Sequence, residues 1–295
     1  MRKILLASTA LVALTSVSAM AADISISGVT EFKYTNDTEQ TTDESNFAVE
    51  SDVAINFSMT ADNGMSATMT YGFDDTAMAA DDASATLSGD FGSVMIVNGA
   101  STDDAYVEAM TDKVNFANDG SDLAFGIAGP TGNKMIAGDT VAYKLPSVVD
   151  GLTIAIQHTN ESNSETFGYG LSYNAGIATV NVANMASNSK EASAASITGS
   201  IGGVGFGVEQ VNVDVTEGTT SETEFTGYGV SYTVADGVKI GYEAGDKKVG
   251  TTETSYTQFE VDYTVAPGIT LSMTSSEVDD STDISSLDIN LALSF

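Results

Sequence analysis

The only histidine of the chain stands close to two residues that could join it in nucleophilic catalysis. His158 lies in the stretch IQHTNESN, where Asn160 and Ser162 follow it. Hydrolases combine a hydroxyl nucleophile, a histidine base and a third group that orients the base. This spacing does not match such a motif closely, so the sequence favours a histidine without a catalytic role. We therefore do not predict an enzyme, and a hydrolase is the weakest alternative.

Carboxylates are the second group that could do chemistry, and they gather in residues 99–138. This stretch contains the segment NDGSD, residues 118–122, whose oxygen ligands suit a hard cation such as Ca²⁺. It lacks the complete twelve-residue calcium loop with its final glutamate. The simpler interpretation is a solvated acidic segment, so we expect no cofactor, with Ca²⁺ at the acidic loops as the alternative.

The overall charge excludes one class of partner. The chain has 41 Asp and Glu against 10 Lys and Arg, and a formal net charge of −31. Nucleic-acid binding needs basic groups for the phosphates, so nucleic acid is excluded as a partner. The 295 residues contain no cysteine, so neither disulfides nor a cysteine metal site stabilises the fold.

The first residues have the pattern of an export signal. Arg2 and Lys3 precede an apolar stretch, which ends at the small-residue site Ala19–Met20–Ala21. The sequence predicts a signal peptide over residues 1–21 and a single mature domain over residues 22–295. Loss of Arg2 and Lys3 would change the net charge to −33 and would leave no arginine in the chain.

The strands that position these residues are predicted from the alternation of apolar and polar residues, which has a period of two. At the end of the chain, Leu287, Ile289, Leu291, Leu293 and Phe295 alternate with small or polar residues. Such alternation is typical of a strand with one apolar and one polar face. The pattern recurs along the chain and predicts sixteen strands, at residues 23–34, 46–60, 65–73, 83–89, 92–98, 139–146, 151–158, 166–174, 177–184, 193–201, 204–212, 223–234, 237–244, 254–265, 268–275 and 285–295.

The connections between these strands alternate between short turns and longer polar loops. This alternation is typical of an antiparallel up-and-down meander. An even and high strand number, with apolar faces that no helix covers, predicts an all-β fold: a closed transmembrane barrel. Sixteen strands leave an aqueous channel. A structural or adhesive surface protein, with the same alternation in a soluble sandwich or solenoid, is the alternative.

Parity divides the charged strand residues between the two faces of such a barrel. Phe295 and its odd-numbered neighbours would face lipid, and Asp288 would face water. The same reasoning predicts a mostly negative lumen, lined by Lys33, Glu50, Asp52, Lys144, Lys239, Glu260, Asp262 and Asp288.

Three segments carry a resemblance to a known family. They are ATLSGDFGSVMIVNGA at residues 85–100, VAYKLPSVVDGLTIAIQH at residues 141–158, and the terminal Phe295. With these, the chain resembles a general-diffusion porin of the Gram-negative outer membrane, most like the alphaproteobacterial kind. The resemblance implies a passive channel for ions and small hydrophilic solutes, surrounded by outer-membrane lipid. It also implies that Phe295 is the signal that the assembly machinery reads.

The resemblance implies a role for the long connection over residues 99–138. It occupies the place of the third loop of porins, which folds into the barrel and narrows the channel. Its candidate constriction residues are Asp103, Asp104, Glu108, Asp112, Lys113, Asp119 and Asp122. Many porins set arginines opposite this loop, and none exist here. The connection adds six acids against two lysines to a lumen where acids already outnumber lysines, so we expect a channel that prefers cations.

Short strands predict the oligomeric state. Strands 83–89 and 92–98 have about seven residues, and at about 2.5 Å per residue they cannot cross a 25 Å apolar band. Such a low wall needs protein against it rather than lipid. The resembling family packs its low wall at a threefold axis, so we expect a homotrimer.

Overall fold

The computed structural model describes most of the chain after the predicted signal peptide. The described residues are 23–38, 43–74, 80–98, 105–107, 110, 139–161, 164–188, 190–215, 221–279 and 284–295. Residues 1–21 lie outside this part, so their removal stays a prediction.

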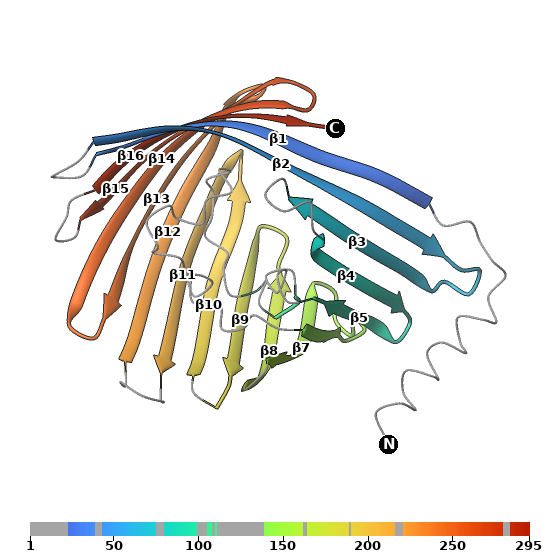
Figure 1. The fold of residues 1–295 in the computed structure, drawn as a ribbon. Coiled ribbons are helices and arrows are strands. Elements are labelled where there is room, and N and C mark those ends of the chain that lie inside the picture. Colours follow the sequence, from blue (N-terminus) through green and yellow to red (C-terminus); the bar gives the residue numbers. More distant parts are fainter. Residues whose placement is uncertain are drawn as a thin grey trace.

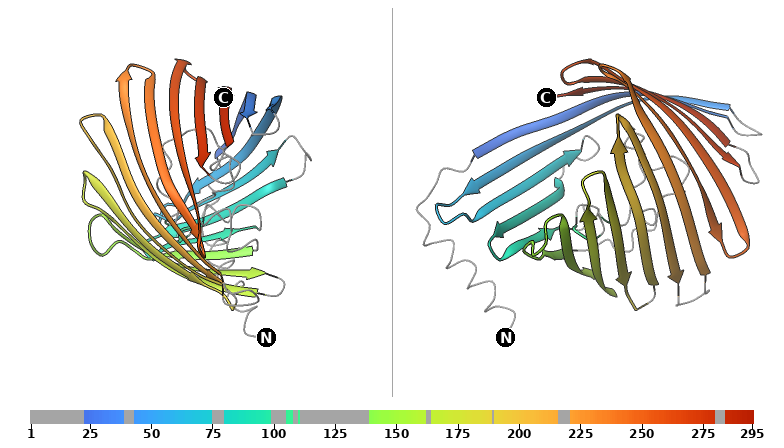
Figure 2. Two further views of the ribbon diagram at one scale, coloured as in Figure 1. Left: turned by 90° about the vertical axis from the view of Figure 1, so that its left-hand side faces the viewer. Right: turned by 180° about the vertical axis from the view of Figure 1, so that it is seen from behind.

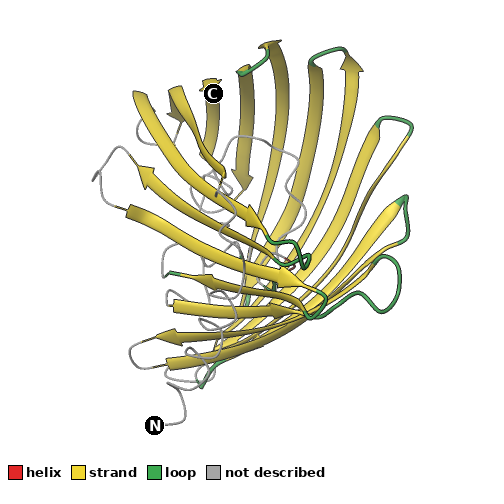
Figure 3. Ribbon diagram, turned by 90° about the vertical axis from the view of Figure 1, so that its right-hand side faces the viewer, coloured by secondary structure: helices red, strands yellow, loops and turns green. Residues whose placement is uncertain are grey.

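The predicted all-β fold with sixteen strands is confirmed. Figure 1 shows the strands following one another around a wall, and Figure 2 shows that wall from two further sides. Figure 3 contains only strands and loops within the described chain, and no helix there is long and apolar enough to cross a membrane. The strands are β1 (Asp23–Thr38), β2 (Asp43–Thr60), β3 (Ser66–Asp74), β4 (Ala80–Gly89), β5 (Gly92–Val97), β6 (Asp139–Lys144), β7 (Leu152–Glu161), β8 (Ser164–Asn174), β9 (Ala178–Ala186), β10 (Lys190–Ile201), β11 (Val204–Val215), β12 (Ser221–Ala235), β13 (Val238–Val249), β14 (Thr252–Ala266), β15 (Ile269–Asp279) and β16 (Ile284–Ser294).

Every strand pairs with its sequence neighbours, and β16 pairs with β1, so the sheet closes into an antiparallel barrel. The seam runs from the pair Val29–Ser294 to the pair Thr38–Ser285. Closure leaves no unpaired sheet edge, which a barrel in lipid requires.

The two faces of the wall are inverted relative to a soluble protein. Val208 on β11 is 55% exposed, whereas its neighbour Glu209 is 2% exposed. Large apolar side chains point outward all round the barrel, and Tyr173, Tyr232 and Tyr263 lie among them near strand ends. An outward apolar surface with aromatic residues near its rim is typical of a membrane barrel.

The two ends of the barrel differ. One end of the barrel is the turn end, where β1 begins and β16 ends. Its hairpins close through glycines such as Gly237 (φ 76°) and Gly268 (φ 77°). The register shifts by one residue just before each of them, between Thr233 and Ala235 and between Thr264 and Ala266. A left-handed glycine beside a bulge is a common way to close a hairpin. The opposite end is the loop end.

Several strands continue further at the loop end than the periodicity predicts. The strand predicted to end at residue 244 continues to Val249, and the one predicted to end at residue 212 continues to Val215. Outward positions there are polar, such as Asp246 on β13 and Asp214 on β11, so the alternation with an apolar outward face is lost, although Val211 and Val213 on the inner face of β11 are buried. The backbone ladder continues without it, and part of what we predicted as loop is strand.

The low wall lies one strand further along than predicted. β4 has ten residues, so the prediction of a seven-residue strand there is wrong, whereas β5 and β6 have six each. Six residues of a tilted strand rise about 15 Å, well short of a 25 Å apolar band. Two neighbouring strands therefore leave the wall low beside the connection over residues 99–138.

Candidate functional site: the barrel lumen

The strand register places all eight predicted lumen residues on the inner face. Glu50 lies opposite Glu31, and Lys239 lies opposite Asp262. The same register adds inner-face residues that the predicted strand ends had cut off, among them Asp37, Lys190 and Lys247. Extending the period-two count beyond the apolar positions would have found them. The predicted residues on this face are Lys33, Glu50, Asp52, Lys144, Lys239, Glu260, Asp262 and Asp288.

One lysine serves two carboxylates on the wall formed by β1 and β2. The Lys33 Nζ lies 2.6 Å from the Glu50 carboxylate and 3.2 Å from that of Glu31. Asn290 on β16 donates to Glu31 at 2.6 Å. The network links three strands across the seam and carries one negative charge in excess, because two carboxylates share one ammonium.

Other inner carboxylates are hydrogen-bonded along the wall. Ser272 donates to Asp262 at 2.8 Å, and Ser286 donates to Asp288 at 3.0 Å. A hydroxyl donor stabilises an ionised carboxylate without neutralising it. These hydroxyl donors therefore add no positive charge to the inner face.

Three further glutamates of the inner face are almost completely covered. Glu209, Glu243 and Glu260 are 2%, 5% and 2% exposed. Each has a glycine as a register partner, for example Gly227 opposite Glu209. A glycine neighbour leaves room for a long side chain to lie along the wall.

A part of the long connection lies inside the barrel. Ala105 packs with inner-face residues of β5 and β6. Tyr106 shares a 2.6 Å hydrogen bond with Ser93, and the Lys144 ammonium lies 5.0 Å from the centre of its ring. A cation over an aromatic ring is an attractive contact. Because Ser93 and Lys144 lie at the turn end, the connection reaches deep along the low wall.

All seven predicted constriction residues lie outside the described residues. They are Asp103, Asp104, Glu108, Asp112, Lys113, Asp119 and Asp122. The predicted Ca²⁺ segment over residues 118–122 lies there as well. In the part of the chain that the structure describes, no three acidic or histidine side chains form a group that could hold a metal ion.

The histidine lies on the outer face. His158 is exposed and stands between Val141 of β6 and Phe167 of β8. Its surroundings on the barrel are those of a lipid-facing side chain, and Ser162 lies outside the described residues. The geometry gives no support to a catalytic role for this residue.

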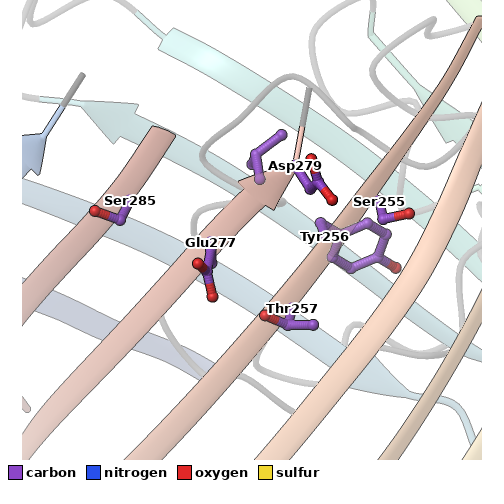
Figure 4. Close-up of a pocket in the computed structure, with 7 residues that line it drawn as sticks. Ser255, Tyr256, Thr257, Glu277, Asp279 and Ser285 are labelled. Carbon is purple, nitrogen blue, oxygen red and sulfur yellow. The ribbon is translucent and has the colours of Figure 1, made fainter. Parts of the chain in front are cut away.

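Hollows occur at two places on the described strands. One, of about 590 Å³, lies at the loop end of β14 to β16 and is lined by Tyr256, Glu277, Asp279 and three hydroxyl residues (Figure 4). The other, of about 500 Å³, is an apolar groove on the outer face of β2 to β5, between Phe57, Met69, Leu87 and Ile96. The first has two carboxylates in its lining, and the second borders the low wall.

The sequence profile of one family, described as Gram-negative porin, matches residues 7–283. That span covers nearly the whole chain and includes every strand of the barrel except β16. The chain belongs to this porin family. No curated protein matches it in sequence.

Solved structures share the fold of this porin. A porin refined at 1.8 Å resolution has a TM-score of 0.70 at 16% identity, over 92% of this chain and all of that one. The trimer form of OmpT, an outer membrane protein of Vibrio cholerae, has a TM-score of 0.72 at 13% identity, over 94% and 100% of the chains. An anion-selective porin from Comamonas acidovorans has a TM-score of 0.69 at 10% identity, over 93% and 100%. The predicted porin resemblance is confirmed, and this porin is an outer-membrane β-barrel.

Proposed function

We propose that this porin is a passive diffusion channel that prefers cations over anions. The observation that carries the proposal is the charge of the inner face, where carboxylates outnumber lysines. Lys33 is already shared by two glutamates, and Lys144 is stacked on Tyr106. Low-dielectric walls focus the remaining negative field along the channel.

The charge of the wall acts on a passing ion only at short range. At 0.1 M salt the Debye length is about 10 Å, comparable with the radius of a narrow bore, so the ion feels the wall. At 1 M it falls to about 3 Å, and the preference should fade. The deciding measurement is the zero-current potential of the purified porin in a planar bilayer under a KCl gradient. K⁺ should cross more easily than Cl⁻, and a preference for Cl⁻ would overturn the proposal.

The acids of the long connection are part of the proposal. Tyr106 and Val107 lie inside the barrel. Asp103, Asp104 and Glu108 are close to them along the chain, so we expect these acids to lie near the channel. Neutralising these three together with Asp112 should reduce the zero-current potential. An unchanged potential would mean that the wall acids alone set the preference.

We further infer that the porin is a homotrimer. The low wall of β5 and β6 and the apolar groove beside it form one outward surface that lipid covers poorly. One structural relative is described as a trimer. Native mass spectrometry from mild detergent should show three copies, and a monomer would contradict the inference.

A further inference from the structure

Two glycines in the middle of β8 face the lumen at the point where the long connection meets the wall. Gly168 lies opposite Gln157 and Met185, and Gly170 lies opposite Ala155 and Ala183. Glycine is unfavourable inside a strand and often marks a close approach of other atoms. The outward neighbours on β8 are bulky aromatic and aliphatic residues, so small size is confined to its inner face.

Side-chain atoms of the long connection approach both glycines, and at position 168 a Cβ would also lie 3.0 Å from the Met185 Cγ of β9. A Cβ at position 170 would lie 2.6 Å from the Met110 Sδ, and a Cβ at position 168 would lie 3.1 Å from the Val107 Cγ1. Both distances are below ordinary van der Waals contact. The side chains of Val107 and Met110 therefore occupy space that a side chain on the inner face of β8 would need.

Polar and apolar contacts hold the connection in that position. The backbone N–H of Val107 donates to the Gln157 Oε1 at 3.2 Å, and Met110 donates to the Val107 carbonyl at 3.0 Å. Val107 is completely buried and Met110 is 7% exposed, in one apolar cluster with Ala155, Ala183 and Met185. This apolar cluster packs the connection against the wall, as a small hydrophobic core would.

We propose that Gly168, Gly170 and Gln157 form a seat that sets how far the connection projects into the channel, and thereby its open width. The inference rests on the proposed diffusion through the lumen. Side chains at positions 168 and 170 would displace Val107 and Met110 away from the wall. Val107 and Met110 lie on the lumen side of β8, so displacing them away from the wall narrows the path of an ion.

The test is the single-channel conductance of the full-length porin with Gly168→Val or Gly170→Val. Both variants should conduct less than the unchanged porin. Ser27→Thr is the control, since it adds one methyl to the exposed inner face of β1, far from β8. Heat-modifiable mobility shows whether each barrel has folded. Adding Met110→Ala to Gly170→Val should restore much of the lost conductance, which a glycine needed only for barrel curvature would not show.

A disulfide gives a second test that does not depend on tolerating a bulky side chain. A sulfur in place of the Val107 Cγ1 would lie 3.1 Å from a Cβ at position 168, which is within reach of a disulfide. The chain has no cysteine of its own. With Val107→Cys and Gly168→Cys together, oxidation should form the bond and leave an open channel, with the same conductance after reduction.

The outcomes separate the seat from the channel. If the porin without substitutions does not conduct, the proposed function is wrong. A conducting porin would overturn the seat alone if folded Gly168→Val and Gly170→Val variants conduct normally. The seat would also be overturned if the cysteine pair stays reduced under oxidising conditions.

Discussion

At the scale of single residues, the pairing of Lys33 with two glutamates determines the net charge that the β1–β2 wall exposes to the channel. Its ammonium lies between Glu31 and Glu50, which face each other across the strand pair. Lys33→Met should raise the preference for K⁺, because two carboxylates then remain without their counter-ion. It should also destabilise the folded barrel by about 1 kcal/mol, the scale of a partly exposed ion pair. Zero-current potential and urea unfolding in detergent measure the two effects.

A matched substitution on the other side of the pair should change the potential in the opposite direction. Glu50→Gln leaves Lys33 paired with Glu31 alone, and the network loses its excess negative charge. The preference for K⁺ should therefore fall. Potentials that move in the same direction for both variants would show that this network does not act through its charge.

At the scale of elements, the seam between β1 and β16 is closed by the last residue. Gly28 and Phe295 exchange two backbone hydrogen bonds, at 3.0 and 3.2 Å. The phenyl ring lies over the glycine, where a Cβ would be 2.8 Å from a ring carbon. Gly28→Val should displace the ring and destabilise the barrel by about 1–3 kcal/mol, as overpacking does elsewhere. Refolding from urea into detergent micelles measures this without the assembly machinery.

The cost at Gly28 should depend on the ring. With Phe295→Ala already present, Gly28→Val should cost much less, because the atoms that it would displace are gone. An equal cost in both backgrounds would attribute the effect to the backbone oxygen of Asp52, which lies equally close. The predicted reading of Phe295 by the assembly machinery concerns export and is not probed by this refolding.

At the scale of the whole molecule, the two faces of the barrel should respond differently to the same charge. Ile55 and Leu291 lie on the outer face, whereas Asp52 and Asp288 lie on the inner one. A lysine at either outer position should cost about 2–4 kcal/mol near the bilayer midplane. Asp52→Lys and Asp288→Lys should fold normally in lipid vesicles and change the conductance. Equal folding of all four variants would contradict the assignment of faces.

The sequence by itself determined the strands, their faces and the closed barrel. Side chains alternate with a period of two, so Leu287 to Phe295 predicted an outward face without any contact being known. It failed where that signal ends, at the loop-end extensions such as the one that places Lys247 on the inner face. The outward positions of those extensions are polar, and on β11 the apolar residues Val211 and Val213 face inward, so the apolar outward face on which the prediction relied is absent.

Only the tertiary structure decided which inner residues act together. The pairing of Lys33 with both Glu31 and Glu50 depends on strand register, and the contact of Asn290 with Glu31 depends on closure between the two ends of the chain. The approach of Met110 to Gly170 joins residues sixty positions apart. Periodicity is a local property of a strand, whereas these contacts depend on how the barrel brings distant strands and the long connection together.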